Sequence, residues 1–145
     1  MSKKQPECKV QLLHHNASVP TRGTESAAGY DLYNPADTFI PAKSQLLIPI
    51  GIAMAIPDGW VGQINPRSSV ASKRNLRIGA RVIDSDYRGE IKVNLHNDTD
   101  EDVFIEEGER IAQMVILPHY ASDLEVVDTL DETERGEGGF GSTGI

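Results

Sequence analysis

The chain has 145 residues, a length that suits a single folded domain. Its formal net charge of -8 at pH 7 excludes a general affinity for nucleic acid or for an anionic membrane, because both need a basic surface. Its single cysteine, Cys8, excludes an intrachain disulfide, and no apolar run approaches the roughly 18 residues of a membrane-spanning helix.

Short apolar segments rich in β-branched residues, with glycine, proline and asparagine turns between them, predict an all-β fold. Residues 69–74 are expected to form at most one or two helical turns. Many short strands with frequent turns favour a sandwich, a barrel or a jelly roll. In chain order, strands are expected at residues 9–13, 45–55 (one long strand or two, interrupted near Pro49 and Gly51), 60–64, 82–83, 91–95, 103–105, 110–117 and 124–127.

The C-terminal residues 129–145 differ in composition from the β domain expected over residues 1–128, because they are acidic and then rich in glycine. They are expected to form a mobile arm outside the core. Glycines let backbone N–H groups approach an anion closely, and Arg135 offers a fork of donors that suits phosphate. Phe140 can stack on a base, and Ser142 and Thr143 add hydroxyl donors. These features indicate a phosphate-binding lid.

A second candidate phosphate site follows the strand expected at 60–64. Pro66 fixes the chain where the strand ends, and Arg67, Ser68 and Ser69 then supply a guanidinium and two hydroxyls. The alternative is an ordinary helix start in which a serine caps the first turn.

Residues 79–90 carry two carboxylates near a tight turn. Asp84 lies where the strand Val82-Ile83 ends, a position from which a carboxylate can activate a water molecule. Asp84 and Asp86 together could instead form a metal pair, or both could be solvated acids of a hairpin.

Three further polar residues interrupt apolar surroundings. Asp31 is expected either to pair with a structural arginine or to face a cation in a site. Arg110 is expected to form a structural salt bridge, whereas Gln113 could bind either a protein partner or a ligand. Cys8 is not expected to be a nucleophile, and the four histidines lack the spacing of a zinc site.

Five segments of the sequence carry these features. In chain order they are residues 27–32 around Asp31, residues 66–69, residues 79–90, residues 108–114 around Arg110 and Gln113, and residues 135–144 of the arm. Together they resemble the five motifs of the trimeric dUTP pyrophosphatases (dUTPases), and the resemblance extends from about Lys9 to Gly144. The most specific matches are IDSDYRGE and RGEGGFGSTG. The resemblance implies a jelly-roll-like distorted β-barrel of the β-clip type and a homotrimer whose sites are shared between subunits. Asp31, residues 66–69 and Gln113 would come from one chain, residues 79–90 from a second and the arm from a third.

The implied reaction is hydrolysis of dUTP to dUMP and pyrophosphate with Mg²⁺ on the phosphates. It would limit uracil incorporation into DNA and supply dUMP for thymidylate synthesis. By resemblance, Asp84 activates the attacking water and Tyr87 packs on the deoxyribose. The backbone of Gly79, Val82 and Ile83 would read the uracil edge.

The same resemblance assigns the remaining site residues. Asp31 would reach the magnesium through water, and Arg135 would bind the γ-phosphate. Phe140 would cap the uracil. The other substrate ligands it implies are Arg67, Ser68, Ser69, Gln113, Gly141, Ser142 and Thr143, with a partly structural role for Arg67.

One departure from the family pattern is Arg81, where the family usually has glycine; its side chain is expected to point away from the pocket. Two alternatives stay open: the related dCTP deaminases, and a nucleotide-controlled binding protein whose ordering arm exposes a partner surface. The expected partners are dUTP and two further copies of the chain, without nucleic acid or membrane. The N-terminus lacks the apolar core of a secretory signal, so a cytoplasmic location, or a nuclear one in a eukaryote, is expected rather than secretion.

Overall fold

The computed structural model describes residues 5–141 and confirms the all-β fold. The strand pairs in this part of the chain are antiparallel, and no helix in it has the length and apolarity to cross a membrane. In chain order the elements are β1 (Lys9–Leu12), β2 (Gly29–Tyr33), β3 (Thr38–Ile40), β4 (Ser44–Pro49), β5 (Ile52–Ala55), β6 (Trp60–Asn65), α1 (Ser68–Lys73), β7 (Leu76–Ile78), β8 (Val82–Ile83), β9 (Lys92–Asn97), β10 (Val103–Ile105) and β11 (Arg110–Pro118).

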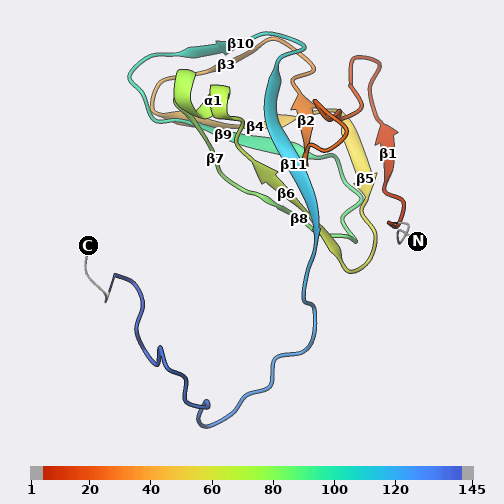
Figure 1. Ribbon diagram of the computed structural model, residues 1–145. Helices are drawn as coiled ribbons and strands as arrows, with labels where there is room; N and C mark the ends of the chain where they lie inside the picture. Colours follow the sequence, from red (N-terminus) through yellow and green to blue (C-terminus); the bar gives the residue numbers. More distant parts are fainter. Residues whose placement is uncertain (1–4, 142–145) are drawn as a thin grey trace.

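The strands form two main sheets and two strand pairs. One sheet has the order β2-β11-β6-β8 and the other β4-β9-β7, while β1 pairs with β5 and β3 with β10. Their inward side chains form one core because alternate residues of each strand are apolar, for example Ile64 and Met114 in the first sheet and Val93 and Leu95 in the second. Figure 1 shows these strands gathered into one body, from which the segment after β11 leads away.

Residues 45–55 form two strands rather than one. Gly51 separates β4 from β5 with a φ of 77°, a left-handed conformation that glycine adopts without strain. The predicted helical turns correspond to α1, and the strands at β1, β6, β8, β9, β10 and β11 are confirmed to within about two residues. Strands β2, β3 and β7 were not predicted.

The prediction of a strand at residues 124–127 is wrong. This segment is extended but has no partner strand within residues 5–141, and Leu124 and Val126 are 89% and 97% exposed. Its apolar alternation resembles a half-buried strand, yet nothing in the described part of its own chain covers it (Figure 1).

A buried asparagine ties together the chain segments at one end of the core. Asn97 is fully buried at the end of β9. Its Nδ2 donates to the carbonyls of Ile40 (3.0 Å), Pro41 (3.2 Å) and Glu101 (2.8 Å), and its Oδ1 accepts from the backbone N (3.1 Å) and the hydroxyl (2.7 Å) of Thr99. One side chain therefore satisfies groups from two segments, residues 40–41 and 99–101, and ties both to the end of β9.

We expect Asn97→Ala to lower the free energy of unfolding by about 2–4 kcal/mol, because it leaves several buried polar groups without partners. Thermal melting at fixed protein concentration measures the change. The matched control is Asn16→Ala, which removes one exposed hydrogen bond to the Pro35 carbonyl and should change melting little. Equal effects of both variants would contradict this account of Asn97.

Candidate functional site

Three polar side chains form a row across the first sheet. Gln113 of β11 lies opposite Asp31 of β2 on one side and opposite Asn65 of β6 on the other. Residues directly opposite in antiparallel strands point to the same face. The three side chains of the row therefore lie on one face of the sheet, whereas the residues next to them along each strand point to the other face, into the core.

The segment after β6 folds back over this row. The Nε2 of Gln113 donates to the Pro66 carbonyl at 3.0 Å, and Arg67 Nε lies 3.0 Å from Asp31 Oδ1. Arg110 Nη1 lies 3.8 Å from the other carboxylate oxygen, and Arg67 Nη1 donates to the Arg110 carbonyl at 3.4 Å. The Asp31 side chain is only 14% exposed. Asp31 thus pairs with two arginines, and the structural salt bridge expected of Arg110 is confirmed.

Gly29 makes this arrangement sterically feasible. A Cβ on Gly29 would lie 2.2 Å from Gln113 Oε1, so a larger residue here would displace the Gln113 side chain from its position over β2. Sequence reasoning did not identify Gly29, although a glycine within a strand signals a close approach of this kind.

The hydroxyls of Ser68 and Ser69 are not used to cap α1. The N-cap residue is Arg67, which makes no side-chain cap hydrogen bond, and α1 is anchored by buried Val70. Within residues 5–141 neither serine hydroxyl has a hydrogen-bond partner, so both remain available to a ligand beside Arg67.

A second cluster lies on the turn after β8. Strand β8 pairs with the far side of β6, and Asp84 follows it directly. The Asp84 carbonyl accepts from Tyr87 N at 3.1 Å, whereas its carboxylate has no ion-pair or hydrogen-bond partner in the described part of the chain. The Tyr87 hydroxyl donates to the Glu90 carbonyl at 2.7 Å, and Glu90 Oε2 accepts from Gly51 N at 2.9 Å. A fixed turn therefore presents a free carboxylate.

The start of this hairpin is closely packed. A Cβ on Gly79 would lie 1.7 Å from Asn94 Oδ1 and 2.7 Å from His96 Nε2, so a larger residue here would displace these two side chains. Arg81 directs its side chain toward the end of β6, where Nε donates to the Ile64 carbonyl at 3.0 Å and the guanidinium donates to the Asn65 side chain.

The two clusters do not meet within one chain. Asp31 and Asp84 are three strand spacings apart across the sheet and about four residues apart along it, a separation of roughly 20 Å. Residues 5–141 contain no group of three acidic, histidine or cysteine side chains that could hold a metal ion.

The C-terminal arm lies apart from both clusters (Figure 1). Arg135 and Phe140 are exposed, and Gly136, Phe140 and Gly141 have positive φ angles of 58°, 50° and 84°. Gly138 N donates to the Arg135 carbonyl at 3.2 Å. Ser142 and Thr143, also predicted to belong to the site, lie outside the described residues.

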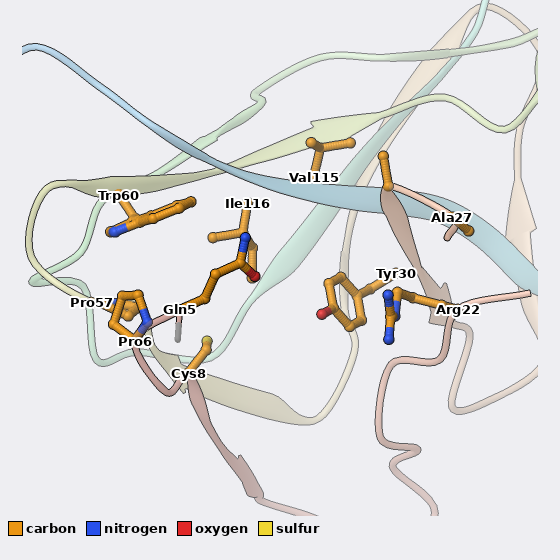
Figure 2. A pocket seen from close by; sticks show the side chains of 11 residues that line it. Gln5, Pro6, Cys8, Arg22, Ala27, Tyr30, Pro57, Trp60, Val115 and Ile116 are labelled. Carbon is orange, nitrogen blue, oxygen red and sulfur yellow. The ribbon is translucent and has the colours of Figure 1, made fainter. Parts of the chain in front are cut away.

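A cavity of about 400 Å³ lies elsewhere, between the N-terminal segment and the edge of the first sheet. Figure 2 shows Trp60, Tyr30, Arg22 and Cys8 around it, and none of the predicted site residues lines it. Burial raises the pKa of the Cys8 thiol, which keeps it protonated at neutral pH and makes it a poor nucleophile.

Comparison with known proteins gives a consistent result. A family model described as dUTPase matches residues 15–144. The deoxyuridine 5'-triphosphate nucleotidohydrolase of Arabidopsis thaliana is 46% identical over 97% of this chain and 84% of its own length, and that of Yarrowia lipolytica is 49% identical over 94% and 88%.

Solved structures agree with these relatives. The dUTPase of Staphylococcus bacteriophage 80alpha with dUpNHpp has a TM-score of 0.91 and 32% identity, covering 97% of this chain and 100% of that chain. A mutant dUTPase from phage phi11 of S. aureus, described with a structural Mg(II) ion, has a TM-score of 0.81 and 28% identity over 86% and 98%.

We expect Asp31→Asn to lower the free energy of unfolding by about 1–2 kcal/mol, because it leaves two partly buried arginines without their carboxylate. Melting temperature at fixed protein concentration measures the effect. Asp98→Asn is the control, since Asp98 pairs with Arg77 at 3.1 Å but is 64% exposed and should change melting little. A larger shift for Asp98→Asn would mean that burial does not decide the strength of these pairs.

Proposed function

The chain belongs to the dUTPase family, and on that premise we propose how its residues and its subunits share the work of the reaction. Its activity is the hydrolysis of dUTP to dUMP and pyrophosphate. The curated relatives are nucleotidohydrolases, which favours this reaction over deamination of dCTP. By consuming dUTP, the enzyme would limit uracil incorporation into DNA and supply dUMP for thymidylate synthesis.

Asp84 is the proposed general base, and its unpaired carboxylate at the end of β8 is the observation that carries the proposal. A base must accept a proton from the attacking water, so it cannot already be engaged by a protein cation. The bonds from Tyr87 N to Asp84 and from Gly51 N to Glu90 hold the turn in place. Water positioned by Asp84 would attack phosphorus, and the leaving pyrophosphate would depart.

The row on the first sheet is the proposed phosphate side of the site. The free hydroxyls of Ser68 and Ser69 and the guanidinium of Arg67 lie beside it. Gln113 has two possible roles in this proposal. Its amide would either leave the Pro66 carbonyl and donate to a phosphate oxygen, or keep its bond to Pro66 and hold residues 66–69 in place while Ser68 binds the phosphate. Because Asp31 holds Arg67 by one edge, the arginine fork is oriented before substrate arrives.

The metal-ligating groups of a single chain are few, and they fit a magnesium ion that is held mainly by phosphate oxygens and water. Asp31 is the one carboxylate of the row, and both its oxygens already face arginines. Mg²⁺ usually keeps several waters and binds through one or two carboxylates plus substrate phosphates. Asp31 would therefore accept hydrogen bonds from water on the ion. When bound, magnesium neutralises charge that develops on the phosphates.

The hairpin is the proposed uracil side. Backbone groups of Gly79, Val82 and Ile83 would read the base edge, and the Tyr87 ring would pack on the deoxyribose and exclude a 2′-hydroxyl. The position of Arg81 supports this proposal, since its guanidinium is bound at the end of β6, to the Ile64 carbonyl and the Asn65 side chain.

A homotrimer with shared sites would bring these parts together. The roughly 20 Å between the two clusters argues that a site is completed by another subunit. The arm, residues 129–145, would come from a third subunit and close over the site that the other two form. Arg135 would then lie on the γ-phosphate, Phe140 on uracil, and Gly141, Ser142 and Thr143 near the phosphates. The body would comprise residues 1–128. We place the enzyme in the cytoplasm, or in the nucleus of a eukaryotic cell.

We expect Asp84→Asn to reduce kcat for dUTP by about 10²- to 10⁴-fold while dUTP still binds, because the amide cannot accept the proton of water. Pyrophosphate release and equilibrium binding of a non-hydrolysable analogue measure the two effects. Asp86→Asn is the matched control on the same exposed turn and should retain near-normal turnover. Similar losses for both variants would argue for a role of the turn as a whole.

Mixed trimers test how the subunits share a site. Neither Asp84→Asn subunits nor subunits lacking residues 129–145 should be active alone. If hairpin and arm come from different chains, every mixed trimer keeps one complete site, and equal coexpression should restore about a quarter of wild-type activity. Absence of any recovery, with mixed trimers confirmed by mass spectrometry, would mean that one chain supplies both parts.

A further inference from the structure

A surface formed by β3 and β10 lies outside the proposed site and exposes two aromatic rings. Phe39 and Phe104 are directly opposite each other, with ring centroids 4.8 Å apart and an interplanar angle of 44°. Phe39 is 65% exposed and Phe104 39% exposed, whereas the adjacent Ile40 and Ile105 are buried. Contact between two large rings that remain in water identifies a candidate interaction surface.

Carboxylates flank the rings on the same face. Asp37 directly precedes β3, and Asp102 and Glu106 directly flank β10. Continuing the alternation of each strand by one residue places the three carboxylates on the same face as the rings. Continuing the register by one residue places Asp37 opposite Glu106. Like charges directly opposite one another are unfavourable, and a cation between them would remove that cost.

These carboxylates have no cation of their own. In the described part of the chain, no lysine or arginine forms an ion pair with Asp37, Asp102 or Glu106. Two of them are oriented by the backbone instead, since Asp37 accepts from Glu107 N at 2.8 Å and Asp102 accepts from Ala42 N at 2.9 Å.

Two of the nearby cations are committed to other partners, whereas Lys73, which lines the hollow beside Asp102 and Phe104, has no ion pair in the described part of the chain. Arg74 donates to the Phe104 carbonyl at 2.6 Å and to Glu109 at 2.7 Å. Lys43 donates to the Asp98 carbonyl at 2.8 Å and lies 3.4 Å from Asp100. The surface is therefore a pair of aromatic rings around which three carboxylates outnumber the one uncommitted lysine, with the excess of negative charge at the Asp37 and Glu106 end.

We propose that this surface, termed the β3–β10 patch (Asp37, Phe39, Asp102, Phe104 and Glu106), binds an extended, arginine-bearing segment of a partner protein. An arginine can stack on the rings, because the guanidinium is planar and weakly hydrated, and a second can fork to a flanking carboxylate. In an extended segment, arginines at alternate positions share one face about 7 Å apart, which matches the spacing from the rings to the carboxylates.

Charge complementarity selects this occupant over a second copy of the chain. Each copy has a formal net charge of -8, and joining two identical patches would bring their carboxylates together. The patch contains none of the residues assigned to dUTP hydrolysis, so the proposal does not depend on the mechanism above.

The test uses the full-length protein and the peptide acetyl-GRVRVRG-amide, with acetyl-GQVQVQG-amide as the uncharged control. We expect saturable binding of the arginine peptide, one per chain, with NMR shifts at the Phe39 and Phe104 rings. Phe39→Thr/Phe104→Thr should weaken binding at least about fivefold. Asp37→Asn/Glu106→Gln should weaken it similarly and reduce its salt dependence.

The matched control is Glu25→Gln/Asp58→Asn, which makes the same change in net charge at two exposed positions elsewhere and should bind the peptide as wild type does. Unchanged dUTP hydrolysis in every variant verifies folding. Equal weakening by the control pair would reduce the interaction to general attraction for an acidic protein and overturn the proposal. A change in sedimentation of the Phe39→Thr/Phe104→Thr assembly would overturn it too, because the patch would then be a contact between copies.

Discussion

The register of β11 against its two neighbouring strands determines where the polar side chains of the first sheet lie. The strand pairs with β2 on one side and β6 on the other, which aligns Asp31, Gln113 and Asn65 across three strands. A slip of one residue would turn Gln113 inward and bring the fully buried Met114 to the surface. The apolar core that fixes Met114 therefore also fixes the row that we propose for phosphate binding.

The same sheet keeps the two halves of the chemistry apart. Arg67 and its neighbours follow one end of β6, while Asp84 follows β8 near the other end. A rigid sheet cannot close that distance, which is why the proposed mechanism requires a second subunit rather than a movement within one chain. In that proposal, local cations and amides, with magnesium, account for the binding of a polyanionic substrate by a chain of net charge -8.

The sequence predicted those strands whose apolar and polar residues alternate clearly along the chain. Strands β6, β9 and β11 were predicted because their apolar positions alternate. Strands β2, β3 and β7 were missed, and length alone does not explain this, because β8 and β10 have only two and three residues and were predicted. Residues 124–127 have the right alternation but no partner strand in the described part of their chain. The two arginine partners of Asp31 and the position of Arg81 depend on pairings distant in sequence. A single sequence could therefore name the candidates but could not choose between them.

The exposed segment after β11 also has a consequence for the newly made chain. Leu124, Val126 and Leu130 are exposed, and Asp123, Glu125 and Asp131 are their neighbours in the sequence. An uncovered apolar segment of this kind invites edge-to-edge pairing with other chains, and interspersed like charges oppose it. The acidic residues of this segment therefore act against aggregation of the newly made chain.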